Sequence, residues 1–169
     1  DLYKKMMNQG IPIVFFDRRV DGIEASQVRI DDYLMAFFMV EALIRSGCRK
    51  IVHLAGPDHI INGIDRHRGY RAALGKFSIP YDERYVLKGG LSAEEGASAI
   101  EGCLSEGLDM DGVFGFTETA TLGAKSMLQK MNYRIPEDVS LCWISGTALC
   151  TIVHPTITAV ELPVIEMAT

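Results

Sequence analysis

The hydrophobic pattern of the chain alternates between short continuous apolar runs and longer stretches in which apolar residues recur every three or four positions. The short runs predict strands buried on both faces, and the periodic stretches predict amphipathic helices. The predicted strands are residues 11–16, 51–55, 84–87, 113–116 and 139–144, and residues 28–30 and 159–162 are expected to be extended segments. The predicted helices are residues 31–46, 63–77, 92–106 and 118–131, and Pro163 is placed to open a last one.

Regular alternation of strands and helices predicts an α/β fold, a doubly wound parallel sheet with flanking helices. We expect residues 31–157 to form one complete lobe of this kind. Residues 1–30 and 158–169 hold too few elements to bury their own apolar faces. We therefore expect them to be parts of a second lobe, which the chain leaves and re-enters.

An arginine heads the apolar stripe of the predicted helix at 63–77. Arg66 is followed at i+4, i+7 and i+11 by Tyr70, Ala73 and Phe77, which are expected to face the core. Open α/β sheets bind ligands beyond the carboxyl ends of their strands, so Arg66 is a candidate ligand residue that contributes little packing. The alternative is a solvated arginine whose stem lies along the apolar surface.

Other polar residues fall at the carboxyl ends of predicted strands. Asp17, Thr117 and Ser145 each directly follow an apolar run. Because helices also begin at this edge, these side chains are candidates for ligand contact. Each has an ordinary alternative: Asp17 could pair with the arginines that follow it, and Thr117 and Ser145 could cap a helix or close a turn.

Composition narrows the classes of function. A net charge of −5 and the lack of a basic helix or arm argue against direct nucleic-acid binding by this chain. No run reaches the ~18 apolar residues of a membrane span. The four cysteines form no CxxC pair, which predicts free thiols in a reducing compartment. Without a metal-ligand spacing of histidines or a GxSxG elbow, we expect no metal, no cofactor and no enzymatic activity.

Seven motifs occur in order along the chain: GIPIVFFDR, IDDY, LIRSGCRKIVHLAG, RHRGYRAAL, DGVFGF, IPEDVSL and HPTITAV. Their order and spacing resemble the effector-binding core of the lactose/galactose-repressor family of transcription regulators, which shares its fold with periplasmic sugar-binding proteins. The resemblance implies two lobes joined by three crossing strands, with a small effector in the cleft between them. It also implies that this chain holds the carboxyl-side lobe, without the DNA-binding headpiece and most of the amino-side lobe.

The resemblance implies a set of effector-binding residues: Asp17, Asn62, Arg66, Leu91, Thr117, Trp143 and Ser145. In the family, the arginine that matches Arg66 clamps sugar hydroxyls with its planar fork of donors. Leu91 replaces an aromatic residue, Thr117 an asparagine and Ser145 an aspartate. Trp143 replaces a glycine, and core packing is the favoured alternative to a pocket role for it. Because these replacements remove side chains that contact the sugar in the family, we expect an ordinary hexose to bind poorly.

Three functions fit these observations. The preferred one is the effector-sensing and homodimerising part of a cytoplasmic regulator, in which a sugar-like molecule changes the lobe angle and repositions the headpiece. Residues 148–153 and the helix at 118–131 could form the two-fold interface, or could be buried within the lobe. The second function is a periplasmic sugar-binding protein for solute uptake. The third is a small enzyme that uses Asp17, Arg66 and Glu118 on a sugar or its phosphate.

Overall fold

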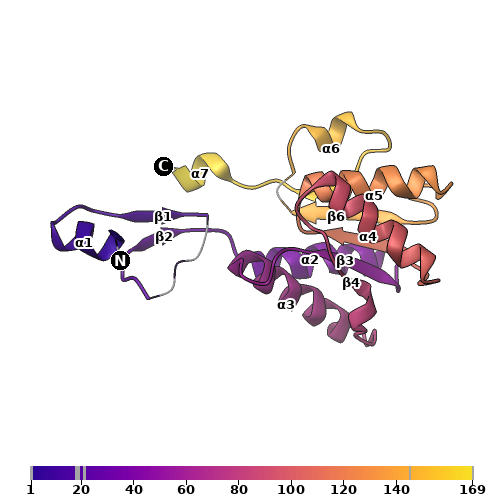
Figure 1. The fold of residues 1–169 in the computed structure, drawn as a ribbon, viewed down its shortest axis with the longest axis horizontal. Coiled ribbons are helices and arrows are strands. Elements are labelled where there is room, and N and C mark those ends of the chain that lie inside the picture. The colour runs from indigo at the N-terminus through magenta and orange to yellow at the C-terminus, as the bar shows by residue number, and fades with distance from the viewer. Residues whose placement is uncertain (1, 18–19, 21, 145, 169) are drawn as a thin grey trace. The chain divides into compact units, whose positions relative to one another are not determined.

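The computed structural model describes most of the chain, namely residues 2–17, 20, 22–144 and 146–168 (Figure 1). The chain divides into two compact units. The larger unit is Asp32–Leu162, and the smaller one combines Asp1–Asp31 with Pro163–Thr169. The larger unit holds the elements that position the candidate site.

A five-stranded sheet of order β4-β3-β5-β6-β7 forms the centre of the larger unit, and all of its neighbouring strands are parallel. The strands are β3 (Ile51–Ala55), β4 (Val86–Lys88), β5 (Gly112–Gly115), β6 (Ser140–Ile144) and β7 (Thr158–Val160). The helices are α2 (Asp32–Arg45), α3 (Ile61–Lys76), α4 (Ala93–Ser105), α5 (Glu118–Lys130) and the short α6 (Leu149–Ile152). The predicted doubly wound α/β fold is confirmed.

The two faces of the sheet are covered by different helix pairs, as the two-residue period of a strand requires. Val52 and Leu54 of β3 point into an apolar core that they share with buried residues of α4 and α5. His53 lies between them and points the other way, where its ring stacks on Tyr70 of α3. The central strands β3, β5 and β6 are therefore buried on both faces, as their continuous apolar runs predict.

Two helix ends in the larger unit show local capping contacts. The Ser92 hydroxyl accepts from the Glu95 N–H, and the Glu95 carboxylate accepts from the Ser92 N–H, so the two residues form a capping box at the start of α4. Gly47 follows α2 with a φ of +112°, a conformation that glycine adopts without strain. The segment predicted as a strand at 84–87 differs. It opens as a 3₁₀ turn, η1 (Glu83–Tyr85), and becomes strand only at Val86.

The smaller unit contains α1 (Leu2–Asn8), a parallel pair of strands, β1 (Val14–Phe16) and β2 (Ser26–Val28), and α7 (Val164–Ala168). The prediction of a strand at 11–16 buried on both faces is wrong. Only Val14–Phe16 is strand, and the side chains of Val14 and Phe16 are 62% and 48% exposed. A two-stranded sheet of this size cannot cover both faces of a strand.

Two helices, α1 and α6, were not predicted by the periodic pattern, because both are too short to show a helical repeat. Within the described residues, no helix has both the length and the apolar character that crossing a bilayer requires.

Candidate functional site

The strand order changes direction between β3 and β5, because β4 lies on one side of β3 and all later strands lie on the other. Open α/β sheets bind ligands at the carboxyl end of such a switch point. Here Gly56 follows β3 and Phe116 follows β5. A Cβ on Gly56 would lie 2.6 Å from the Phe116 ring, so the two loops pack closely only because residue 56 is glycine.

Arg66 is anchored at this switch point by two hydrogen bonds. Its Nε donates to Asp32 Oδ1 at 2.7 Å, and its Nη1 donates to the Phe116 carbonyl oxygen at 2.6 Å. The guanidinium also lies over the Phe116 ring, with 4.9 Å between Cζ and the ring centroid. The Arg66 and Asp32 side chains are only 9% and 5% exposed. The expectation that Arg66 contributes little packing is therefore wrong, and so is the solvated alternative.

One edge of the Arg66 guanidinium, at Nη2, has N–H donors available for a further hydrogen bond. Among the described residues, none accepts a hydrogen bond from Nη2 of Arg66. Asn62 lies one helical turn earlier on the same face of α3, and that residue is 8% exposed. Its side-chain amide likewise has no hydrogen-bond partner within the described part of the chain. Polar side chains that keep donors and acceptors available at this edge of the sheet are features of a site that a polar ligand completes.

The other predicted residues of the larger unit differ in their surroundings. Thr117 caps α5, since its hydroxyl accepts from the Ala120 N–H at 3.1 Å and donates to the Gly90 carbonyl at 2.6 Å. That hydroxyl is already engaged. Leu91 is 46% exposed. Trp143 is fully buried in the core, which is the favoured alternative to its pocket role, so we correct its assignment from effector contact to packing.

Two predicted residues lie elsewhere. Ser145 lies outside the described residues. Asp17 belongs to the smaller unit, where it follows β1 with a φ of +67° and donates its N–H to the Val28 carbonyl at 2.9 Å. Glu118, considered for an enzymatic role, accepts from the hydroxyl of Thr147 at 2.8 Å.

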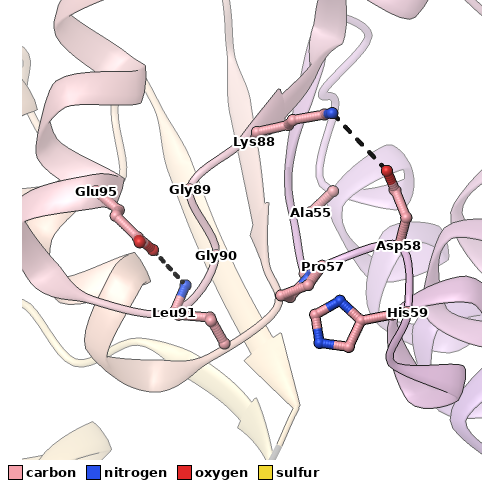
Figure 2. Close-up of a pocket in the computed structure, with 10 residues that line it drawn as sticks. Ala55, Pro57, Asp58, His59, Lys88, Gly89, Gly90, Leu91 and Glu95 are labelled. Carbon is pink, nitrogen blue, oxygen red and sulfur yellow. Dashed lines mark hydrogen bonds and ion pairs between the residues drawn. The ribbon is translucent and has the colours of Figure 1, made fainter.

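A cavity of about 440 Å³ opens at the same edge of the sheet (Figure 2). It is lined by residues 55–59 after β3, by residues 88–91 after β4, and by Glu95 of α4. Sequence reasoning identified only Leu91 of this set as a site residue. The signal that could have found the rest is a pair of glycine-containing turns, Gly56-Pro57 and Gly89-Gly90, each directly after a strand.

A family model described as the periplasmic binding protein-like domain matches residues 40–169 of the chain. The regulator CelR of Thermobifida fusca is 31% identical over 156 residues, which cover 91% of this chain and 46% of CelR. The chain belongs to the lactose/galactose-repressor family. It spans about half the length of the curated relatives that it matches.

Two solved structures of the family share the fold. A LacI-family sugar-binding transcriptional regulator from Escherichia coli, in complex with phosphate, is 26% identical with a TM-score of 0.89, covering 99% of this chain and 60% of its own. A complex of CelR with cellobiose is 30% identical with a TM-score of 0.88, covering 98% of this chain and 51% of its own. The family resemblance that the motifs predict is confirmed.

The histidine near the switch point of this repressor-family domain does not suit proton transfer. His53 is fully buried, and its Nδ1 lies 3.1 Å from the Phe114 carbonyl oxygen. Burial lowers the pKa of His53 from 6.5 to about 3, so its ring is neutral near pH 7. Nor does the described part of the chain contain a group of three or more His, Cys, Asp or Glu side chains that could hold a metal ion.

Proposed function

We propose that this chain is the effector-sensing part of a transcriptional regulator, and that its switch-point site binds an uncharged carbohydrate-like molecule. The observation that carries the proposal is the anchored guanidinium of Arg66 beside the amide of Asn62, which has no partner among the described residues. An Arg edge donates to hydroxyl and ring oxygens, and an amide both donates to a hydroxyl and accepts from it. Together they suit a polyhydroxylated ligand.

The charge balance of the site favours a neutral ligand over an anion. The Asp32 carboxylate already neutralises the Arg66 guanidinium within a buried pair. An anion bound there would meet a guanidinium whose charge a buried carboxylate already offsets. We propose Asn62 and Arg66 as the principal contacts, and Leu91, Thr117, Ser145 and Asp17 as further effector-binding residues.

Ligand binding acts on the angle between two lobes in this proposal. Residues 31–157 form the carboxyl-side lobe, and residues 1–30 and 158–169 belong to the crossing segments and the amino-side lobe. An effector that binds one lobe angle more tightly shifts the population toward it, and thereby repositions a DNA-binding domain of the whole regulator. We infer a homodimer and a cytoplasmic location, because the matched relatives are named as transcriptional regulators rather than uptake proteins or enzymes.

Asn62→Ala separates binding from folding. An amide without a partner contributes no hydrogen bond to folding, so its removal is expected to leave the free energy of unfolding unchanged or raised. Sugar affinity is expected to fall by about 2- to 13-fold, corresponding to roughly 0.5–1.5 kcal/mol for one hydrogen bond.

Calorimetric titration of the chain with glucose and with cellobiose measures the affinity, and urea denaturation measures the stability. Gln129→Ala, at the exposed carboxyl end of α5, is the control amide substitution. Failure of every sugar to bind the unaltered chain would refute the proposed function. A large loss of stability in Asn62→Ala with unchanged affinity would make Asn62 a structural residue instead.

A further inference from the structure

The outer surface of α2 and α3 carries exposed charges of one sign. The two helices lie side by side on one face of the sheet, across it from α4 and α5 (Figure 1). The exposed charged residues of α2 and α3 are all cations, namely Arg45, Arg68, Arg71 and Lys76. The carboxylate residues of the same two helices are buried. We call the surface formed by the four cations the cationic face, and it contrasts with the net charge of −5 of the chain.

Aromatic rings lie beneath two of these cations. The Cζ atom of Arg68 is 5.7 Å from the centroid of the Tyr33 ring. The Cζ atom of Arg71 is 4.5 Å from the centroid of the Tyr81 ring. A ring attracts a guanidinium through its π face and leaves the positive charge in place. Each arginine therefore presents an ordered cation beside apolar ring surface.

The other two cations share one buried carboxylate. Glu41 Oε1 accepts from Arg45 Nη2 at 2.8 Å and from Lys76 Nζ at 3.0 Å. Arg45 Cζ and Lys76 Nζ each lie 5.6 Å from the centroid of the Phe77 ring. With the pair between Arg68 and Asp65, four exposed cations meet two carboxylates, so the cationic face keeps a net positive charge. These contacts order the side chains in advance, which lowers the entropy cost of binding a partner.

We propose that the cationic face docks an acidic segment of a partner protein, in which carboxylates alternate with apolar side chains. The carboxylates of such a segment pair with the exposed cations, and an arginine can bind a carboxylate through two parallel hydrogen bonds. The apolar side chains of the segment cover the ring surface beside each cation, such as that of Tyr33, which is 36% exposed.

Charge favours this occupant over nucleic acid or a second copy of the chain. A long polyanion meets the field of the whole chain, whose net charge is −5, whereas a short acidic segment meets only the charges within a Debye length of about 8–10 Å. The exposed charged residues of α4 are acidic, namely Glu94, Glu95 and Glu101, but their pairing with the cationic face would be head-to-tail and would not close a dimer. The two-fold interface considered at α5 lies across the sheet, so the cationic face stays accessible in such a dimer.

Fluorescence anisotropy with a labelled peptide that repeats Glu-Phe-Leu-Glu tests the docking surface, and a peptide that repeats Gln-Phe-Leu-Gln is the uncharged comparison. The unaltered chain is expected to bind the acidic peptide more tightly than the uncharged one, and added salt is expected to weaken that binding. Arg68→Gln/Arg71→Gln is expected to weaken acidic-peptide binding by about fivefold or more. Arg84→Gln/Arg134→Gln is the matched control, since it removes the same charge from exposed arginines outside α2 and α3 and is expected to leave the affinity unchanged.

Three outcomes overturn the proposal, and none of them involves a sugar, so the proposed function is tested separately. Equal weakening by the two double variants shows that only the net charge of the chain matters. Binding of poly(U) RNA in place of the acidic peptide makes the cationic face a nucleic-acid surface. Self-association of the unaltered chain that Arg68→Gln/Arg71→Gln removes, measured by sedimentation velocity, makes a second copy the occupant. Arg71→Gln alone leaves the ion pairs of Glu41 and Asp65 in place, so unchanged thermal unfolding with weakened peptide binding in this variant supports docking without a change of fold.

Discussion

Replacing Arg66 by alanine tests whether its buried ion pair holds the switch point together. The substitution removes the hydrogen bonds to Asp32 Oδ1 and to the Phe116 carbonyl, and it removes the cation from the Phe116 ring. It takes the guanidinium away from the Asp32 carboxylate, whose side chain is 5% exposed. The perturbation is therefore the loss of a buried charge partner, which differs from the loss of a surface arginine.

The expected cost follows from this burial. Removing one partner of a buried ion pair destabilises a protein by about 3–5 kcal/mol, because the remaining charge stays desolvated. An exposed pair contributes only about 0–1 kcal/mol. Arg84→Ala is the control, since Arg84 pairs with Asp82 at 2.6 Å but has a largely exposed side chain. The two substitutions remove the same chemical group and differ in burial.

Urea denaturation followed by tryptophan fluorescence measures both variants. The chain has a single tryptophan, Trp143, and its side chain is fully buried, so its emission reports exposure of the core. Arg66→Met retains the apolar stem and distinguishes the lost charge from lost packing. A loss below about 1 kcal/mol in Arg66→Ala, similar to that in the control, would contradict the reasoning and return Arg66 to the role of a surface residue.

Two further predictions concern the core. The pKa of His53 is about 3 in the folded chain and about 6.5 in the unfolded chain. Because the unfolded chain therefore binds a proton more readily, acid lowers the free energy of unfolding, by up to about 1.4 kcal/mol per pH unit below pH 6.5. Urea titrations from pH 7.5 to 5 are expected to show a shallower loss for His53→Leu, and equal slopes would refute this. Gly123→Ala is expected to lower the stability of the fold, because a Cβ at that position would overlap the Ala93 carbonyl oxygen. Gly102→Ala is expected to raise it by about 0.5–1 kcal/mol, because no atom lies within 4 Å of a Cβ there. Thermal unfolding measures both, and equal shifts would contradict this packing.

The fold could be predicted largely from local signals. The runs at 51–55 and 113–116 contain enough consecutive apolar residues to indicate strands covered on both faces. In the structure, nearly all residues of β3 and β5 are buried, as this pattern predicts. The Ser92 and Glu95 spacing predicts a helix start because the capping box is a local interaction. The burial of β1 could not be predicted the same way, because burial depends on which elements cover the strand.

The candidate site was predictable only in part, because its geometry depends on contacts between distant residues. Periodicity and the family motif both identify Arg66 as a residue of this edge. Neither identifies Asp32, which lies 34 residues earlier and accepts from Arg66 Nε. The close packing of Gly56 on Phe116 likewise joins two loops that no sequence period connects. The cavity beside them follows from such contacts, so only Leu91 was foreseen.

Because Arg66 serves both the fold and the proposed ligand site, another residue is better suited to test ligand binding. Nε and Nη1 of its guanidinium hold the fold together, and Nη2 is the group proposed to contact a ligand, so a substitution of Arg66 is expected to change stability and affinity together. Asn62 lies one turn away on the same helix face and contributes no side-chain hydrogen bond to the described structure. A loss of sugar affinity in Asn62→Ala at unchanged stability therefore has one explanation, direct contact with the ligand. The same loss in Arg66→Ala has two, which makes Asn62 the more decisive position.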